Sequence, residues 1–427
     1  MPAYTGKFQY LDESGAAVSA GACQFRFDAE TATVTPASGT PIAFDLGDVD
    51  RAVPGDWDFQ LTLFTGRRLE LRQFGPAFRT MSEELLAAWR DRTVRCLLLE
   101  DLEEIARYTA TAALGGPAAP AEVRLYRSNI AVLPLDGPPV QWRLAEVDAV
   151  SFDEATYSVT LASAGERLVI AKLAKKTDEF RGNLDAALDA LRTQQAEALD
   201  STFPFLDPDQ LQRVLRLMPE GRSVPLAALG AIHPKLPDAL IARAVDAPLR
   251  PYFEALSARS ESDALITGYK LIRPDEEQPA EEDETQDAAA PAAPPETGGQ
   301  ADKDEKPPLF FWFFFPLPGG RVAWEATTGS GRATYFFDAA PPVDQAVARL
   351  TRGLALVNFR REPVYLPDES LERQPRFRRY AIGCRKLPDL RALRAAFRGR
   401  AIHTSLDAWT AQVEAASRAL KPGTDGT

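Results

Sequence analysis

The chain has 427 residues, 45% of them hydrophobic, which is enough for three or four domains that each bury a core. Its three cysteines are widely spread and none lies in a C-x-x-C pair, which excludes a disulfide-stapled domain. The N-terminus has no basic region followed by an apolar stretch, and the longest apolar run, residues 309–315, is far shorter than the roughly 20 residues of a membrane span. We therefore expect a cytoplasmic protein without membrane contact, and the abundance of Ala, Arg and Pro is typical of a GC-rich bacterial genome.

The formal net charge of −12 is concentrated in one segment. Residues 274–308 contain twelve acidic residues and two lysines, so the rest of the chain is close to neutral. The same segment is rich in Pro, Ala, Glu and Asp and has no aromatic or large aliphatic residue. Because it cannot bury enough apolar surface to offset its chain entropy, we predict a disordered acidic loop.

The first 200 residues carry the same apolar pattern twice. Phe25 recurs as Val123, 98 residues later, and the dipeptide Val49-Asp50 recurs as Val147-Asp148. Such a repeat indicates a duplicated folding unit, because matching apolar positions bury matching faces. The same spacing relates Phe27 to Leu125, Val34 to Val132, Ile42 to Val140, Phe44 to Trp142, Leu46 to Leu144, Pro36 to Pro134 and Pro41 to Pro139.

Each copy reads as strands followed by one helix. In the first copy, apolar and alternating runs predict strands at residues 6–10, 23–27, 33–35, 42–46, 58–64 and 68–74. Thr80 and Glu83 then form a predicted capping box at the start of an amphipathic helix. The apolar stripes of the two helices are Phe78, Leu85, Leu86 and Trp89 in the first copy, and Phe180, Leu184, Leu188 and Leu191 in the second.

This order resembles the pleckstrin-homology-like (PH-like) superfold, a bent antiparallel barrel closed at one end by its last helix. The resemblance implies one barrel at residues 1–97 and a second at 104–199. It implies no catalytic residues, since members of the superfold mostly bind lipid headgroups, peptides or proteins. The versions that bind phosphoinositides use basic residues in an early hairpin loop. The corresponding loops here, residues 12–19 and 114–121, contain no Lys or Arg.

Residues 200–260 are predicted to form a helical connector. Asp207 is placed to cap a helix that begins with Pro208, and short helices punctuated by proline follow. Three short helices also resemble a helix-turn-helix unit. A DNA reader needs a positive face, however, and residues 201–260 contain seven basic residues against six acidic ones.

Residues 261–427 are predicted to form an α+β domain that the acidic loop interrupts. Strands are expected at residues 264–272, 309–315, 321–326 and 333–337, and helices at 343–356, 387–397 and 406–420. The aromatic run 310–315 suits a strand covered on both faces, and the alternative is an exposed edge that binds a partner. The sequence therefore predicts an α+β protein with two consecutive PH-like barrels, a helical connector and a C-terminal α+β domain.

A catalytic constellation is missing from the sequence. The two histidines, His233 and His403, are not at ligand spacing from a cysteine or from each other. Residues 329–332, Gly-Ser-Gly-Arg, lack the Gly-Lys-Ser/Thr ending of a phosphate loop and fit a hairpin turn. We therefore expect no enzyme activity, no cofactor and no metal.

The strongest charge feature lies at residues 360–400, where twelve basic residues stand against five acidic ones. Three interpretations remain open: contact with a polyanion, a solvated helix face whose Arg stems cover apolar surface, or pairing with the chain's own acidic loop. The candidate polyanion-binding residues are Arg360, Arg361, Arg376, Arg378, Arg379, Arg385 and Lys386.

The function expected from these patterns is protein binding, with the chain acting as a non-enzymatic interaction or scaffold protein for a partner that the sequence does not name. The alternative is a nucleic-acid-associated factor that uses the Arg-rich face and is modulated by the acidic loop. Tandem barrels with an acidic segment also resemble eukaryotic histone chaperones, although no basic nuclear-import cluster accompanies them here.

Overall fold

The computed structural model describes residues 3–100, 102–260, 265–272, 309–326, 333–359 and 363–418. The predicted acidic loop at 274–308, the predicted turn at 329–332 and the residues Arg360 and Arg361 lie outside these ranges. The chain folds into two compact units. The first unit is Met1–Asp189 with Phe359–Arg394, and the second unit is Ala190–Asn358 with Ala395–Thr427. The segment Phe359–Arg394, which lies inside the predicted 261–427 domain, is therefore grouped with the N-terminal residues.

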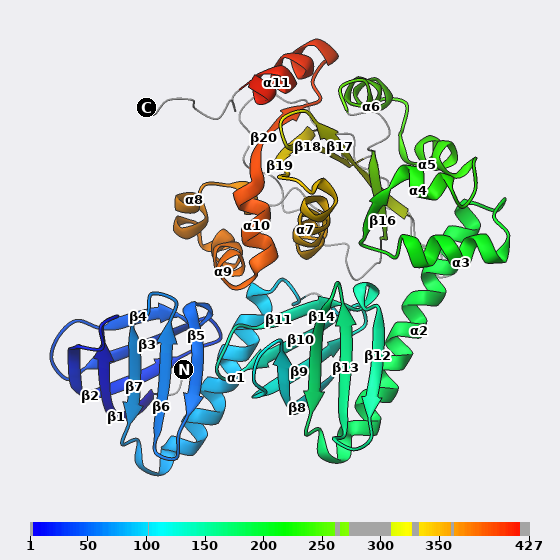
Figure 1. The fold of residues 1–427 in the computed structure, drawn as a ribbon. Helices are drawn as coiled ribbons and strands as arrows, with labels where there is room; N and C mark the ends of the chain where they lie inside the picture. Colours follow the sequence, from blue (N-terminus) through cyan, green and yellow to red (C-terminus); the bar gives the residue numbers. More distant parts are fainter. Residues whose placement is uncertain are drawn as a thin grey trace, which may run out of the picture. The chain divides into compact units, whose positions relative to one another are not determined.

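The first unit begins with a seven-stranded antiparallel sheet of order β4-β3-β2-β1-β7-β6-β5 (Figure 1). A 3-10 turn, η1 (Leu46–Asp48), connects β4 to β5. Phe8, Phe25, Phe59 and Leu61 are fully or almost fully buried in its core. The strands are β1 (Ala3–Leu11), β2 (Ala17–Phe27), β3 (Thr31–Pro36), β4 (Ile42–Asp45), β5 (Val49–Pro54), β6 (Asp58–Leu63) and β7 (Arg68–Arg72).

A second seven-stranded sheet repeats this order as β11-β10-β9-β8-β14-β13-β12. Its connection from β11 to β12 is again a 3-10 turn, η3 (Leu144–Glu146). The strands are β8 (Glu104–Leu114), β9 (Ala119–Tyr126), β10 (Asn129–Pro134), β11 (Val140–Arg143), β12 (Ala149–Asp153), β13 (Ser158–Ser163) and β14 (Glu166–Ala171).

The cross-strand register confirms the spacing predicted from the sequence. Phe25 pairs with Val34 in the first sheet, and Val123 pairs with Val132 in the second. Matching positions on matching strands therefore carry the matching apolar side chains.

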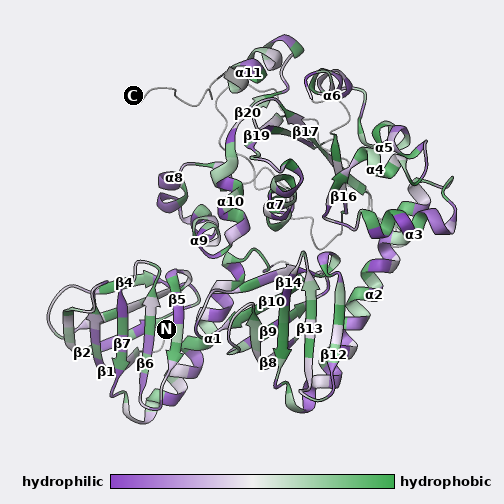
Figure 2. Ribbon diagram, in the orientation of Figure 1, coloured by the Kyte–Doolittle hydropathy of each residue, from purple (hydrophilic) through white to green (hydrophobic). Residues whose placement is uncertain are grey.

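A helix follows each sheet, namely α1 (Phe78–Cys96) and α2 (Thr177–Thr202). Both helices carry hydrophilic and hydrophobic residues in turn along their length (Figure 2). The predicted stripes are buried, apart from a partly buried Leu86. The predicted capping box was wrong: a 3-10 turn, η2 (Gly75–Ala77), runs directly into α1, so the helix starts at Phe78 and has no side-chain cap.

The second unit contains a six-stranded antiparallel sheet of order β15-β16-β17-β18-β19-β20. Strand β20 was not expected, because Arg398, Gly399 and Arg400 interrupt any apolar pattern there. The aromatic strand is buried on both faces, since Phe311, Trp312, Phe313, Phe314 and Phe315 have no exposed area. The strands are β15 (Ser223–Pro225), β16 (Ile266–Leu271), β17 (Leu309–Leu317), β18 (Arg321–Ala326), β19 (Ala333–Asp338) and β20 (Phe397–Ile402).

Helices of the second unit include the predicted connector. Asp207 caps α3 as expected: its Oδ1 accepts a hydrogen bond of 2.8 Å from the amide of Gln210, which completes a capping box. Ser405 Oγ accepts a bond of 3.2 Å from the amide of Ala408 at the start of α11. The helices are α3 (Pro208–Leu217), α4 (Leu226–Gly230), α5 (Leu236–Ala244), α6 (Arg250–Ser257), α7 (Val343–Leu356) and α11 (Leu406–Arg418).

Candidate interaction surface

A C-terminal segment returns to the first sheet. We call residues 363–394 the clasp segment. It consists of η6 (Pro363–Tyr365), α8 (Asp368–Arg373), η7 (Pro375–Phe377), α9 (Arg378–Lys386) and most of α10 (Pro388–Ala396). Helix α9 lies against α1 and η1.

Two glycines allow α9 to approach the first sheet closely. A Cβ atom on Gly383 would lie 2.7 Å from the carbonyl oxygen of Cys96, and one on Gly47 would lie 2.8 Å from Cδ1 of Ile382. Leu371, Phe377, Tyr380 and Ala381 of the clasp segment form a small buried cluster against which Leu98 packs. The contact between the clasp segment and the N-terminal part of the first unit therefore includes apolar packing as well as charged groups.

Asp48 of η1 is the residue on which the charged contacts of helix α9 converge. It is only 8% exposed, and its Oδ2 lies 2.6 Å from Nη2 of Arg378. Its Oδ1 accepts a hydrogen bond from Arg385, and Glu372 pairs with both arginines from the other side. Burial nevertheless raises the pKa of Asp48 above its ordinary value, against the lowering effect of the two guanidinium groups. The site therefore holds one desolvated carboxylate that needs its arginines.

Lys386 ends helix α9 and is buried. Its Nζ donates to the carbonyl oxygen of Val49 at 2.9 Å and lies 3.2 Å from Oδ1 of Asp50. The indole Nε1 of Trp89 donates to the same carbonyl at 3.0 Å. The start of β5 is thus held by one residue of α1 and one of α9.

The structure distributes the predicted polyanion-binding residues unevenly. Arg378, Arg385 and Lys386 face carboxylates of the first sheet, and Arg379 pairs with Glu100. Arg376 has its guanidinium 4.5 Å from the ring centre of Phe377 and is exposed. Polyanion binding by this set stays a prediction.

A second buried ion pair ties α1 to the end of β4. Arg92 donates to Asp45 through Nε at 2.9 Å and through Nη2 at 2.6 Å, and its Nη1 lies 3.1 Å from Glu30. Hydrogen bonding to Asp45 and its negative charge raise the pKa of Arg92 in spite of burial. This fork geometry is the strongest form of the arginine–carboxylate contact.

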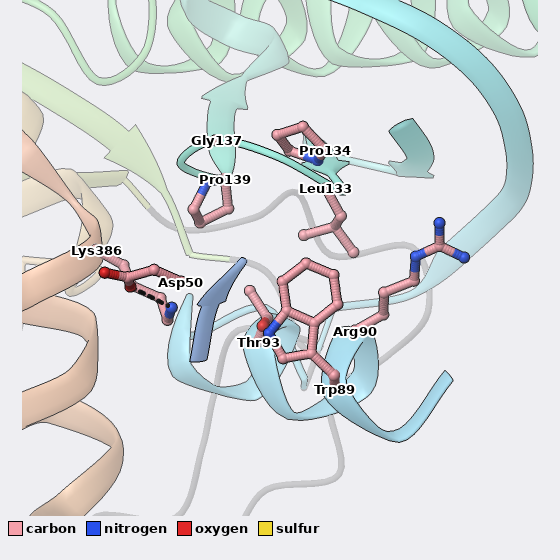
Figure 3. Close-up of a pocket in the computed structure, with 9 residues that line it drawn as sticks. All are labelled: Asp50, Trp89, Arg90, Thr93, Leu133, Pro134, Gly137, Pro139 and Lys386. Carbon is pink, nitrogen blue, oxygen red and sulfur yellow. Dashed lines mark hydrogen bonds and ion pairs between the residues drawn. The ribbon is translucent and has the colours of Figure 1, made fainter. Parts of the chain in front are cut away.

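A small pocket lies where the two sheets of the first unit meet (Figure 3). Trp89, Arg90 and Thr93 line it from α1, while Asp50 and Lys386 lie at one side (Figure 3). The facing wall comes from Leu133 and Pro134 at the end of β10 and from Gly137 and Pro139 in the β10–β11 connection.

The β10–β11 connection of the second copy also covers the edge of β5. The amide of Ala52 donates to the carbonyl oxygen of Leu135 at 3.2 Å, and Arg51 forms an antiparallel bridge with Asp136. The same two residues form an ion pair of 2.8 Å. Leu135 packs against the core of the first sheet. A short extended segment thus adds to the edge of a seven-stranded sheet.

The histidines occupy different settings. His233 accepts a hydrogen bond of 3.2 Å from the amide of Lys235 just before α5, as expected for a turn residue.

His403 belongs to a buried polar group: its Nε2 lies 3.1 Å from Thr334 Oγ1 and 3.4 Å from Glu325 Oε2. Thr334 donates to Glu325 at 2.6 Å and accepts from Trp409 Nε1 at 2.9 Å. Thr334 and Glu325 are at most 1% exposed, so this group stabilises the interior of the second unit.

The sequence patterns did not identify the carboxylates that pair with the basic residues of the clasp segment. Asp48 lies in η1, Asp50 in β5 and Glu100 after α1, and no local pattern relates them to residues more than 270 positions away. The sequence does contain Gly47 and Gly383, which permit the close approach of α9. A glycine alone, however, does not identify the segment that packs against it. Among the described residues, no helix is long and apolar enough to cross a membrane.

Comparison with known proteins gives structural matches alone. No protein-family model matches the chain, and no curated protein matches it. The pleckstrin homology (PH) domain of USP37 matches with 17% identity and a TM-score of 0.18, over 21% of this chain and 98% of that one. The N-terminally truncated linker-DH/PH domains of p115-RhoGEF match with 11% identity and a TM-score of 0.18, over 27% of this chain and 49% of that one. The chain thus spans about half the length of the second structure. Seven antiparallel strands followed by a helix, as in β1–β7 and α1, recur as β8–β14 and α2 within a mixed α+β protein.

Proposed function

We propose that the protein is a non-catalytic interaction scaffold built on two consecutive PH-like units, in which the clasp segment completes the first unit. Its partner is a protein, and it acts in the cytoplasm, where the free thiols of its three cysteines stay reduced. The observation that carries the proposal is the seating of Leu135 and Asp136 on the edge of β5. It is an example, within this chain, of a sheet edge that binds an extended polypeptide.

The charge arrangement supports protein binding over nucleic-acid binding. A polyanion that reached Arg378 or Arg385 would have to compete with the buried carboxylate of Asp48 for both guanidinium groups. Counterion release, which drives phosphate binding, contributes little where the cation is already neutralised by a protein carboxylate. We therefore infer that the main role of these arginines is to stabilise the first unit.

Cross-linking of the full chain to captured partners, followed by mass spectrometry, tests this function. We expect cross-links from a partner protein to fall on the strands of the first unit, and capture to survive nuclease digestion. The matched measurement is binding of duplex DNA and single-stranded RNA at low and moderate salt, for the full chain and for a chain that lacks residues 274–306. Binding that tightens on this deletion and falls steeply with salt would establish the nucleic-acid alternative instead. Conversion of a substrate that a single substitution abolishes would show an enzyme.

A further inference from the structure

Each sheet of the first unit carries one strongly exposed aromatic side chain at the same hairpin tip. Trp57 directly precedes β6 and is 77% exposed, and Tyr157 directly precedes β13 and is 65% exposed. Each lies four residues before the leucine that pairs with a leucine of the following strand, Leu61 in β6 and Leu161 in β13. Among the large hydrophobic side chains that the structure describes, these two are the most exposed. The repeat thus presents an aromatic ring to solvent at one position twice.

In the second copy, a cation of the chain itself covers this tip. The guanidinium carbon of Arg181, in α2, lies 4.0 Å from the ring centre of Phe152. The Tyr157 ring contacts Phe152 edge-on, with the ring centres 6.2 Å apart. Because the face of an aromatic ring is electronegative, it attracts a cation that lies over it. The charge of Arg181 is also balanced within its own helix, since its Nη1 lies 3.8 Å from Asp178.

The first copy has the exposed ring without the cation. Pro54 stands where the second copy has Phe152, because each pairs with the residue two positions before the leucine of the next strand. Arg79 is the counterpart of Arg181 in the repeat, and its Nε lies 2.9 Å from Glu83 of its own helix. Within the described part of the chain, no guanidinium or ammonium group lies over the Trp57 ring.

The residues around Trp57 supply one carboxylate that is ready for a cation. Asp56 is exposed and makes no hydrogen bond or ion pair with another described residue. Asp58 lies opposite Arg72 of β7, so these two charges offset each other. The charged residues of β5, and Arg72, have partners of their own: Asp50 with Lys386, Arg51 with Asp136, and Arg72 with Gln9. Asp56 is therefore the uncompensated charge beside the indole.

We propose that Trp57 and Asp56 form a docking site for an arginine side chain on the surface of a partner protein. The guanidinium plane stacks on the indole, and the carboxylate of Asp56 neutralises its charge. The proposal rests on the scaffold function above and names the chemistry by which the partner is recognised. Arginine is favoured over lysine because its planar group stacks on rings and is weakly hydrated, and because a guanidinium fills the equivalent place in the second copy. A membrane is not favoured, since Asp56 would face the phosphates of the lipid headgroups.

The chain has six tryptophans, so the indole N–H resonances of the full protein provide a readout that is specific to the site. The Trp57 resonance is the one that Trp57→Phe removes. The probe is an end-blocked peptide of one arginine between two glycines, and the matched control carries citrulline, which has the same shape without the charge. We expect the arginine peptide to shift the Trp57 resonance saturably, and added salt to weaken its binding. Asp56→Asn should weaken that binding about threefold.

The second copy provides an internal control. Tyr157→Trp places an indole where Arg181 already covers the neighbouring ring, so we expect its new resonance not to respond to the arginine peptide. Arg181→Ala in the same background removes that cation, and the resonance should then shift as the Trp57 resonance does. Both positions are exposed or partly exposed, so these substitutions leave the core of the sheet unchanged.

Equal shifts of the Trp57 resonance with both peptides, or no shift with either, overturn the proposal. A response of Tyr157→Trp while Arg181 is present would show that an exposed ring alone suffices, and it contradicts the proposal as well. Broadening of the Trp57 resonance by phosphatidylcholine vesicles, without a response to the arginine peptide, would assign the tip to a membrane instead. Partner cross-links on the first unit that persist in Trp57→Ala leave the scaffold function standing without this site, whereas the absence of any cross-linked protein from the parent chain removes the scaffold function.

Discussion

Arg378 and Asp48 are 330 positions apart in the sequence, and Nη2 of the arginine lies 2.6 Å from Oδ2 of the aspartate. The contact joins helix α9 to the turn η1 of the first sheet. Because Asp48 is buried, it is a desolvated charge that depends on its partners. The contact therefore gives at least one arginine of the basic stretch 360–400 a structural role within the first unit.

The Asp48 site should show strong coupling in a double-mutant cycle. Arg378→Ala leaves a buried carboxylate with one arginine fewer, and we expect a loss of about 3 kcal/mol in the free energy of unfolding of the first unit. In an Asp48→Asn background the same substitution should cost much less, because no buried charge is stranded. Denaturant titration measures the four proteins. Arg373→Ala, at a side chain that is 79% exposed, serves as the control and should cost almost nothing. Additive effects of the first two substitutions would show that the ion pair does not stabilise the unit.

The raised pKa of Asp48 predicts a pH-dependent difference between Asp48→Asn and the parent protein. The folded state holds the proton more tightly than the unfolded state, so this group stabilises the fold below its ordinary pKa of 3.8, and that contribution is lost as pH rises through the raised value. The asparagine variant does not titrate. Its stability relative to the parent should therefore increase as pH rises from below 3.8, which denaturation at a series of pH values measures. The opposite trend would mean that the arginines outweigh burial and lower the pKa.

Substitution of Arg92 should destabilise the first unit even when the new residue is lysine. Its guanidinium spans both oxygens of Asp45, and the side chain is only 7% exposed. We expect Arg92→Met to cost about 3 kcal/mol, because it leaves Asp45 without its partner, and Arg92→Lys to recover part of that loss. Thermal unfolding of both variants tests this. Arg79→Met, at an exposed ion pair with Glu83 on the same helix, provides the comparison and should be nearly neutral.

The three cysteines should be unreactive while the protein is folded. Burial raises the pKa of Cys96 to about 12 and the pKa values of Cys23 and Cys384 to about 11. The thiolate is the reactive form, so at pH 8 its population falls by about two orders of magnitude or more relative to an ordinary thiol. Labelling with a thiol reagent should be slow under native conditions and rapid in denaturant. Fast labelling of one cysteine in the folded protein would show that its surroundings open locally.

Thr334 should be important for the interior of the second unit. Its hydroxyl donates to Glu325 and accepts from Trp409, and Thr334→Val preserves shape while it removes both bonds. Leaving two buried polar groups without this partner should cost about 1–3 kcal/mol. Thr334→Ser keeps the hydroxyl and should cost less. Denaturation followed by tryptophan fluorescence compares the two variants, and equal stability of the valine variant and the parent would contradict the role assigned to the hydroxyl.

The duplicated strands were predictable because their signal is local and repeated. Alternation along Phe59, Leu61 and Leu63 defines one buried face of β6, and the same logic applies to Val159 and Leu161 of β13. The aromatic strand β17 and helix α7 were also found from pattern and length alone. Each of these elements carries its own periodicity, so no long-range information was needed.

The clasp segment was not predictable in the same way. The sequence predicts no helix at 378–386, where basic residues such as Arg378 and Arg385 dilute the apolar stripe formed by Ile382 and its neighbours. Its basic residues are satisfied by carboxylates hundreds of positions earlier in the chain, and a charge count cannot distinguish a solvated arginine from one buried against an aspartate. Pairing with the acidic loop was one of three interpretations of this basic stretch, and it stays a prediction. Among the described residues, Arg378 and Arg385 pair with Asp48 of η1 and with Glu372 of the clasp segment itself.

The return of residues 359–394 to the first unit has a consequence for biosynthesis. Asp48 and Asp50 leave the ribosome early, whereas Arg378, Arg385 and Lys386 emerge only after the whole of the intervening chain has been translated. At about 5–20 residues per second this interval is on the order of ten seconds or more. Until residues 363–394 have been translated, the carboxylates of Asp48 and Asp50 lack these basic partners, and Leu98 lacks the apolar cluster against which it packs.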